Sequence, residues 1–316
     1  MAWQHGVRAV SVLLLVWMAA WVTSDAAWGG EGKKLPKPET IELTTKDGVQ
    51  LKATYYGQGE GSKAVPVILL HGFKSNRNAF ADLARNLQQR GNVVIAPDFR
   101  GHGESKRVML PGGIGERTIE AAKLRRGDFE AMVPLDMEAV RRFLVTKNDA
   151  QDVNLNKLCV VGAGMGATIA LHWAARDWTA PPLAVGKQGQ DVKVIVLVSP
   201  AASFKGIPLQ DALRVFADRR VADQVSVMII YGGNNTKAKQ DAQRVHKRLE
   251  RWHPQPGRGE PIAMQTLRLK EGKTSLQGMK LLGAGGEFLH RLIADFIQWR
   301  AADQDFPWSK RRRLGE

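Results

Sequence analysis

The hydrophobic positions of this chain alternate between two patterns, one typical of strands and one typical of helices. Short continuous apolar runs, such as residues 65–70 and 93–96, are typical of strands that are buried on both faces. Between them, apolar residues recur at helical spacing, as Phe80, Leu83 and Leu87 do. The pattern predicts strands at residues 41–45, 49–56, 65–70, 93–96, 158–161, 192–198, 225–231 and 262–269, and helices at residues 78–90, 129–146, 167–175, 209–217, 237–252 and 287–302.

The order of these elements predicts the fold class. Strands and helices alternate along the chain, which is typical of a mostly parallel sheet with helices on both faces. The first two strands flank Lys46-Asp47-Gly48, and an Asp-Gly turn between alternating strands predicts an antiparallel hairpin. We therefore expect an α/β fold with a mostly parallel eight-stranded sheet, an antiparallel N-terminal hairpin and an irregular, glycine-rich insertion at residues 106–127.

The first 26 residues have the features of a secretory signal peptide. Arg8 precedes an apolar run over residues 9–22, and small residues follow up to Ala26. The apolar run is shorter than a comfortable bilayer span. We predict cleavage after Ala26, a linker over residues 27–38 and a periplasmic or secreted protein. The alternative is an uncleaved segment that anchors the chain in a membrane.

The charge of the chain narrows the range of partners. The sequence has 46 Lys and Arg against 31 Asp and Glu, a formal net charge of +15, which favours acidic partners. The basic residues are scattered and not interleaved with aromatic residues, so no nucleic-acid partner is predicted. Residues 310–313 belong to a basic tail (residues 304–316) that we expect to fray. The predicted partner is an unidentified small ligand, whose acidic character the net charge favours.

Metal and redox sites receive no support from the sequence. Cys159 is the chain's one cysteine and lies in an apolar run, so it is expected to be a small buried hydrophobe. A disulfide within the chain and a cysteine metal cluster are thereby excluded. No set of His, Asp and Glu residues shows the spacing of metal ligands. We predict neither a metal nor a cofactor.

Three segments together carry a resemblance to a known family. They are Leu69-Leu70-His71-Gly72-Phe73, Asp98-Phe99-Arg100-Gly101-His102-Gly103-Glu104-Ser105 and Val160-Val161-Gly162-Ala163-Gly164-Met165-Gly166-Ala167. In this order, with helices between them, they resemble the α/β-hydrolase fold family and its serine aminopeptidase and esterase members. The resemblance implies an α/β-hydrolase domain over residues 39–303.

In that family the third segment is the nucleophile elbow, Gly-x-Ser-x-Gly, where the serine occupies a sharp turn between a strand and a helix. The flanking Gly162 and Gly166 are present here, but the central residue is Gly164, which has neither a hydroxyl nor a thiol. Glycine tolerates the strained backbone that the elbow requires. The resemblance therefore implies an elbow that keeps its shape and lacks its nucleophile.

The family's acid and base are also replaced. The pattern Gly-x-x-Asp after the strand at residues 225–231 places Asn235 in the acid position, and an amide cannot stabilise an imidazolium. Gln277 occupies the position of the histidine, and a second alignment puts Gly286 there instead. Neither alignment has a histidine, so we predict a degenerate triad at Gly164, Asn235 and Gln277.

Backbone hydrogen-bond donors are what remains of the family's catalytic groups. The resemblance implies oxyanion donors from the N–H groups of Phe73 and Met165. The helix that begins near Met165 adds a positive dipole at the same place. The expected pocket or elbow residues are His71, Gly72, Gly162 and Gly166. We therefore expect an exported, non-catalytic protein, a pseudoenzyme with a ligand-binding or scaffold role.

An active hydrolase, esterase-like or peptidase-like, is the alternative function. It would need a displaced nucleophile, and Ser105, Ser199 and Ser203 each follow a strand. His71 and His102 are expected to be structural, because the family uses both to hold loops. In some members an insertion where residues 106–127 lie begins a cap over the pocket. Its six basic residues would then guide an acidic ligand, and otherwise lie in a solvated loop.

A cofactor-binding loop is the other interpretation of the elbow segment. Residues 162–167 satisfy the dinucleotide pattern Gly-x-Gly-x-x-Ala between a strand and a helix. That pattern requires an acidic residue at the end of the next strand to hold a ribose. The next strand ends in Val198-Ser199-Pro200, so we prefer the hydrolase interpretation.

Overall fold

The computed structural model describes residues 35–181, 187–254, 257 and 259–311. The predicted signal peptide and most of the predicted linker lie outside the described residues. The described residues belong to one unit that begins at Leu35. Within these ranges, every helix is too short or too polar to cross a bilayer.

From β3 onward, at least one helix separates each strand of the parallel part of the sheet from the next such strand in the chain. The strands are β1 (Glu39–Thr44), β2 (Val49–Tyr56), β3 (Val65–Leu70), β4 (Asn92–Pro97), β5 (Arg107–Met109), β6 (Glu116–Thr118), β7 (Leu158–Ala163), β8 (Val192–Val198), β9 (Ser203–Phe204), β10 (Ile207–Pro208), β11 (Ser226–Gly232) and β12 (Leu267–Gly272). The helices are α1 (Ala81–Gln89), α2 (Arg126–Ala131), α3 (Met137–Asp149), α4 (Met165–Trp178), α5 (Leu209–Phe216), α6 (Arg219–Ala222), α7 (Thr236–Glu250) and α8 (Gly278–Ile297).

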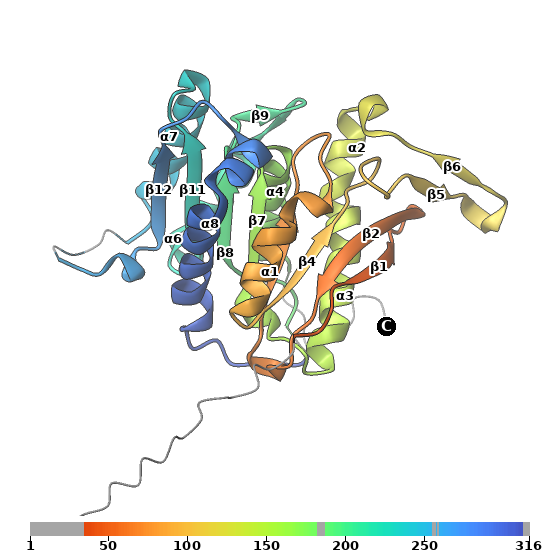
Figure 1. Cartoon of the computed structure of the whole chain (residues 1–316), viewed down its shortest axis with the longest axis horizontal. Coiled ribbons are helices and arrows are strands. Elements are labelled where there is room, and N and C mark those ends of the chain that lie inside the picture. The colour runs from red at the N-terminus through yellow and green to blue at the C-terminus, as the bar shows by residue number, and fades with distance from the viewer. Residues whose placement is uncertain (1–34, 182–186, 255–256, 258, 312–316) are drawn as a thin grey trace, which may run out of the picture. The chain divides into compact units, whose positions relative to one another are not determined.

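A mixed sheet of ten strands forms the centre of the fold (Figure 1). Its order is β12-β11-β8-β7-β3-β4-β2-β5-β6, with β1 paired to β2. The six strands from β12 to β4 in this order are parallel. Strands β1, β2, β5 and β6 are antiparallel to their neighbours. The mostly parallel sheet and the antiparallel N-terminal hairpin are thus confirmed.

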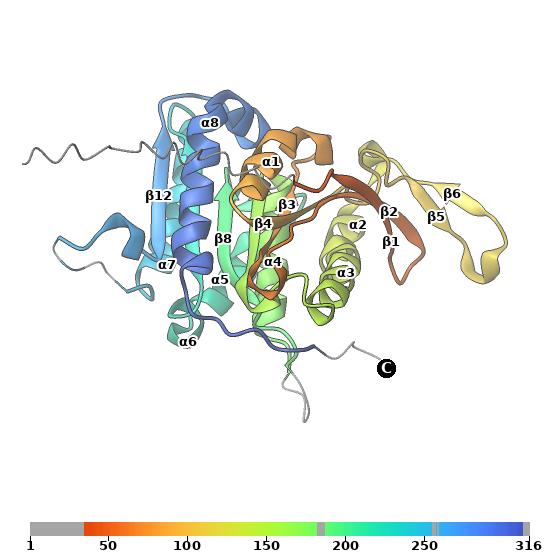
Figure 2. The ribbon, with the colours of Figure 1, turned by 60° about the horizontal axis from the view of Figure 1, so that its bottom comes forward.

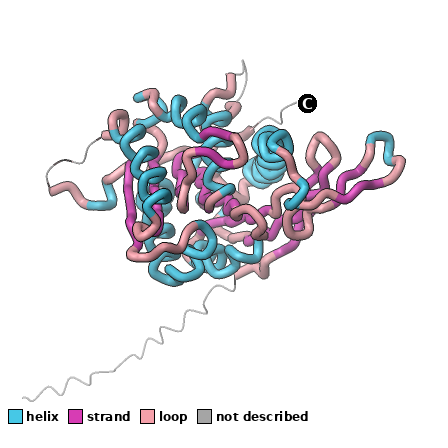
Figure 3. The backbone as a smooth tube through the Cα atoms, turned by 90° about the horizontal axis from the view of Figure 1, so that it is seen from above, coloured by secondary structure: helices cyan, strands magenta, loops and turns pink. Residues whose placement is uncertain are grey.

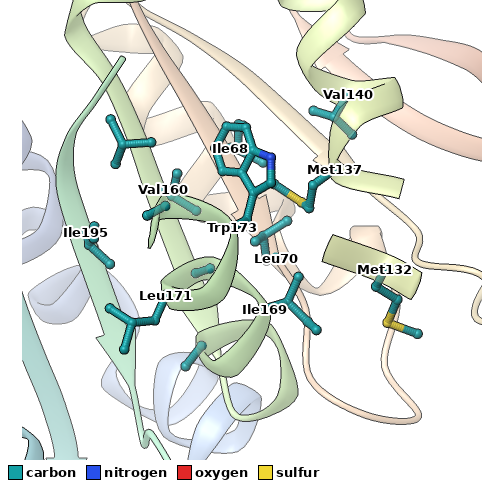
Figure 4. Close-up of a cluster of buried hydrophobic side chains, with 14 of the residues drawn as sticks. Ile68, Leu70, Met132, Met137, Val140, Val160, Ile169, Leu171, Trp173 and Ile195 are labelled. Atoms are coloured by element: carbon teal, nitrogen blue, oxygen red, sulfur yellow. The ribbon is translucent and has the colours of Figure 1, made fainter. Parts of the chain in front are cut away.

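Helices cover both faces of the sheet because its central strands are apolar on both faces. All six residues of β3 are buried, and successive side chains point to opposite faces. Ile68 and Leu70 join the core beneath α3, α4 and α7, whereas Val67 and Leu69 join the core beneath α1 and α8. Figures 1 and 2 show these two layers. In the first core, Trp173 of α4 lies beside Ile68 (Figure 4).

The sheet has two strands more than the eight predicted. The insertion at residues 106–127, expected to be irregular, contains β5 and β6, which form a hairpin. Strand β5 pairs with Val49 and Gln50 of β2, and Val108 is buried against the sheet. The expectation was wrong because the open edge of β2 presents unpaired backbone groups, which recruit a short segment regardless of its glycine-rich surroundings.

Several element boundaries also differ from the prediction. Residues Ile262–Met264 form a 3₁₀ turn, so the last strand starts only at Leu267. The helix expected at residues 129–146 is interrupted by a π-helical turn over Met132–Asp136. Pro134 lies in that turn and lacks the N–H that an α-helix would use. Helix α8 begins at Gly278, earlier than expected.

The basic tail is part of the fold over its described residues. Arg311 is buried, and its Nη2 lies 2.7 Å from the carboxylate of Asp191 and 2.5 Å from Oδ1 of Asn156. The indole N–H of Trp308 donates to the carbonyl of Asn148 at 3.1 Å. The prediction that the tail frays is therefore wrong for its residues up to Arg311. The cause is the buried Asp191 carboxylate, which requires a cation close to it.

Replacing Arg311 tests this contact. Arg311→Ala should lower the free energy of unfolding by about 2–3 kcal/mol, because it removes buried, charge-assisted hydrogen bonds from Asp191. Lys310→Ala is the matched control: Lys310 is adjacent and exposed, so the change should stay within about 0.5 kcal/mol. Urea denaturation followed by circular dichroism measures both. Equal midpoints for the two variants would contradict the buried tail.

Candidate functional site

The turn between β7 and α4 has the geometry of a nucleophile elbow. Gly164 occupies it with φ 55° and ψ −112°, a conformation that is strained for residues with a side chain. A Cβ on Gly162 would lie 2.2 Å from the carbonyl oxygen of Gly166, and a Cβ on Gly166 would lie 2.0 Å from that of Leu70. Both flanking glycines are therefore required by the close approach of α4 to β3 and β7.

Unlike the two flanking positions, the central position of the elbow has space for a side chain. A Cβ on Gly164 would meet no heavy atom within 4 Å. A side chain placed there would project into open space above the sheet, as the nucleophile of the family does. The missing hydroxyl at this position is therefore a consequence of the residue type and not of crowding.

Gln277 lies beside the elbow and is held by hydrogen bonds. Its Oε1 accepts from the Ser199 hydroxyl at 2.7 Å and from the N–H of Gly232 at 3.3 Å. Its Nε2 donates to the carbonyl of Gly232 at 2.8 Å. A Cβ on Gly278 would lie 3.9 Å from the backbone nitrogen of Gly164, so the turn contacts the elbow. The side chain bridges β8, β11 and the start of α8.

The second alignment for the base position puts Gly286 there. Gly286 lies inside α8, where its φ of 46° produces a kink, and a Cβ on it would meet no heavy atom within 4 Å. The contact of Gly278 with Gly164 instead places Gln277 at the elbow. The geometry therefore favours Gln277 over Gly286 as the residue in the base position.

Asn235 has a structural task at the acid position. It follows β11 and is the N-cap of α7, where its Oδ1 accepts from the N–H of Ala238 at 2.9 Å. Among the described residues, no hydrogen bond joins Asn235 to Gln277. In a working triad these two positions are joined by the bond between acid and base.

His71 and His102 hold the loops on the other side of the elbow. Nε2 of His71 accepts from the N–H of Phe99 at 3.1 Å, and Nδ1 lies 2.8 Å from the carbonyl oxygen of Gly72. Burial lowers the pKa of His71 to about 4, so the ring is neutral at neutral pH. Burial also lowers the pKa of His102, whose Nδ1 lies 3.0 Å from the carbonyl oxygen of Arg100.

The loop after β3, which contains Phe73, lies close to the elbow. The predicted oxyanion donors are the N–H groups of Phe73 and Met165. A Cβ on Gly72 would lie 3.4 Å from the carbonyl oxygen of Ala163, which places the loop against the end of β7. The backbone N–H groups of Phe73 and Met165 have no hydrogen-bond partner in the described part of the chain. Met165 is the first residue of α4, so the helix dipole favours negative charge there.

An aromatic cluster with two lysines surrounds Phe73. Its ring packs edge-on against Phe129, at 5.8 Å between ring centres, and at a tilt against Phe204, at 6.0 Å. Nζ of Lys74 lies 5.7 Å and Nζ of Lys205 lies 5.2 Å from the centre of the Phe73 ring. Both lysines are exposed. Their positive charges lie close to the Phe73 ring, which makes this surface attractive to anions.

The serines considered as displaced nucleophiles occupy different environments. Ser105 is buried, and its hydroxyl donates to the carbonyl of Asp98 and accepts from the N–H of Lys52. Ser203 is exposed in β9. Ser199 alone reaches the elbow, where its hydroxyl accepts from the N–H of Gly278 at 2.9 Å and donates to Gln277. An amide oxygen is too weak a base to activate that hydroxyl.

Sequence reasoning named Ser199 among the candidate displaced nucleophiles without its contact with Gln277, and it missed Lys74 and Lys205. Ser199, Lys74 and Lys205 have positive φ, at 52°, 58° and 49°. Such angles are uncommon for residues other than glycine and are not signalled by these residue types. The backbone conformation at each of these residues sets the direction of its side chain. The hydrophobic pattern of the sequence does not reveal that conformation.

Comparisons with known proteins agree with this geometry. The family model for serine aminopeptidase, S33, matches residues 61–267. A non-heme chloroperoxidase of Kitasatospora aureofaciens is 38% identical over 65 residues, and Lipase 1 of Psychrobacter immobilis is 27% identical over 154 residues. These stretches cover 21% and 48% of this chain. They span only 22% and 37% of the lengths of the two relatives.

Solved structures share the fold at low sequence identity. An esterase of Pyrococcus furiosus has a TM-score of 0.58 at 18% identity, covering 84% of this chain and 91% of the esterase. A dienelactone hydrolase of Anabaena variabilis has a TM-score of 0.56 at 16% identity, covering 85% and 100%. Because the family model matches more than half of the chain and these structures share its sheet and helices, the chain belongs to the serine aminopeptidase S33 family of α/β-hydrolases.

Proposed function

We propose that this protein is a non-catalytic member of its family that binds a small acidic ligand at the elbow. The observation that carries the proposal is Gly164, which occupies the nucleophile position with room for a side chain and has none. Covalent catalysis requires a nucleophile and a base within hydrogen-bond reach. Here the nearest candidates are a glycine and an amide.

Binding would use the groups that remain at the elbow. The N–H groups of Phe73 and Met165, the N-terminus of α4 and the two lysines beside Phe73 all favour negative charge. A carboxylate is the acid product of ester hydrolysis, and its negatively charged oxygens would suit donors arranged for an oxyanion. We propose a carboxylate as the recognised group, with the ring of Phe73 contacting the apolar part of the ligand.

An active esterase-like hydrolase is the second candidate. Its support is the family itself and the hydrolases among the structural neighbours. Ser199 is the one serine of the three candidates that reaches the elbow, with a φ of 52° that is unusual for serine. This function would require a base for Ser199, and Gln277 cannot accept a proton at neutral pH. We therefore place it second.

Export is proposed from the N-terminal pattern alone. The run of residues 9–22 after Arg8 is typical of a signal peptide. A periplasmic or secreted ligand-binding protein would meet small acidic molecules outside the cytoplasm. An N-terminal membrane anchor is the alternative, and mass determination of the chain recovered from cells distinguishes the two.

Hydrolysis assays test the absence of catalysis. The purified chain should not hydrolyse activated esters above background and should not react with a fluorophosphonate label, because no activated nucleophile is present. Gly164→Ser combined with Gln277→His should gain labelling, since a base beside the hydroxyl contributes about 10²–10⁴-fold. Each single variant should gain none. Wild-type turnover that disappears in Ser199→Ala would overturn the proposal in favour of the second candidate.

Two glycine substitutions test the elbow geometry. Gly164→Ala should cost about 1–2 kcal/mol of stability, because the added Cβ meets open space and only the backbone angle is unfavourable. Gly166→Ala should cost more than about 3 kcal/mol, because its Cβ would overlap the carbonyl of Leu70. Thermal and urea unfolding measure both. Similar losses for the two variants would be incompatible with this elbow.

Titration with octanoate tests carboxylate binding. The amide signals of Phe73 and Met165 should shift in nuclear magnetic resonance spectra, and the neutral analogue octanol should leave them unchanged. Lys74→Gln and Lys205→Gln should each weaken binding about 2- to 5-fold, the range of an exposed ion pair. Lys237→Gln, on α7 and with its side chain 85% exposed, is the control and should have no effect. Equal shifts with octanol would remove the charge-based argument.

A further inference from the structure

The hairpin β5–β6 projects from the edge of the sheet that is opposite β12 (Figures 1 and 2). Viewed from above, it extends beyond the helices that cover the sheet (Figure 3). Its base is anchored by Val108, which is 3% exposed, and by the pairing of β5 with β2. Strands β2, β4 and β3 separate it from β7 in the sheet. It is therefore an arm at the side of the fold, not a cap over the elbow.

The tip of this arm is apolar and exposed. Met109, Leu110 and Ile114 are 40%, 37% and 83% exposed, and Pro111 between them is exposed as well. Gly112, Gly113 and Gly115 have φ values of 74°, 72° and 103°, which fold the tip into a tight turn. The apolar side chains therefore stand on a convex surface. Exposed apolar groups collected at one protruding place indicate an interaction site.

Basic residues lie along the base of this arm, near its pairing with β2. Residues 106–127 contain six Lys and Arg and two Glu, a net charge of +4. Lys106, Arg107 and Arg117 lie in or beside the hairpin and are exposed. The ion pairs of Arg107 with Glu42 and Glu116 are long, at 3.6 and 3.9 Å, and at the surface, so they leave much of its charge available.

We propose that this arm binds an anionic lipid bilayer, with Met109, Leu110 and Ile114 inserted among the headgroups and the basic residues against the lipid phosphates. A convex apolar tip fits a deformable layer, which closes around it, better than a rigid pocket. Apolar insertion together with basic residues is the combination that gives surface binding to anionic membranes. The positive net charge of the whole chain adds attraction at longer range.

This inference is independent of the proposed function at the elbow. The hairpin and the elbow lie at different places along the sheet, so lipid binding leaves Gly164 and its surroundings accessible. The octanoate titration and the lipid experiment can therefore succeed or fail separately.

A dye at the tip tests the proposal directly. Cys159 is buried, so Ile114→Cys introduces a cysteine that an environment-sensitive dye labels selectively. Vesicles with phosphatidylglycerol should shift the emission of the dye at position 114 to the blue, and pure phosphatidylcholine vesicles should not. Gln240→Cys, exposed on α7, is the control label and should not shift. All variants carry the same N-terminus, so any membrane contact of residues 9–22 is common to them.

Charge and tip variants separate the two contributions. In the labelled chain, Lys106→Gln with Arg117→Gln should raise the lipid concentration for half-maximal shift by about 10-fold or more. Met109→Ser with Leu110→Ser should raise it by a similar factor. Lys237→Gln with Lys247→Gln, on α7, is the matched charge control and should leave it unchanged. Near-ultraviolet circular dichroism verifies that each variant is folded.

Three outcomes would overturn the proposal. The first is an emission at position 114 that does not change with phosphatidylglycerol vesicles. The second is an equal shift with phosphatidylcholine, which would remove the role of the basic residues. The third is a shift that rises with protein concentration without lipid, which would assign the tip to contact with a second copy of the chain.

Discussion

The close contact of the first turn of α4 with the ends of β3 and β7 is the constraint on which the candidate site depends. Gly162 and Gly166 permit it, because a Cβ at either position would overlap a backbone oxygen. The same contact sets the φ of 55° at Gly164 and brings the loop after β3 against the end of β7. The loop after β3 and the first turn of α4 are thereby held close together. None of this requires a side chain at position 164.

The elbow keeps its shape with a glycine at its centre. The residues that the family resemblance assigns to the acid and base positions make structural hydrogen bonds. Asn235 caps α7, and Gln277 joins Ser199 to Gly232 through both ends of its amide. Such bonds stabilise the loops above the sheet whether or not chemistry takes place there.

The β5–β6 hairpin and the buried Arg311 both depend on residues that are distant in the chain. The hairpin satisfies backbone hydrogen-bonding groups, and Arg311 satisfies a buried charge. The open edge of β2 recruits β5, and so displays the basic, apolar-tipped hairpin at the side of the sheet. The buried carboxylate of Asp191 needs a cation close to it. Arg311, which lies 120 residues further along the chain, supplies this cation. Nearby, Asp177 is buried, and burial with the Asp191 charge raises its pKa to about 7. Arg311, one of the last basic residues of the chain, is therefore buried inside the fold.

The sequence by itself determined the fold class, the elbow and the residue types in the three triad positions. Apolar periodicity is a local property, and the glycines of residues 162–166 permit the sharp turn and the close helix approach through local geometry. The sequence did not determine the hairpin in the insertion or the burial of Arg311. Those features depend on partners that are distant in the chain, namely the edge of β2 and the carboxylate of Asp191. Only the tertiary structure decided them, because it alone brings an unpaired strand edge or a buried charge next to the segment that satisfies it.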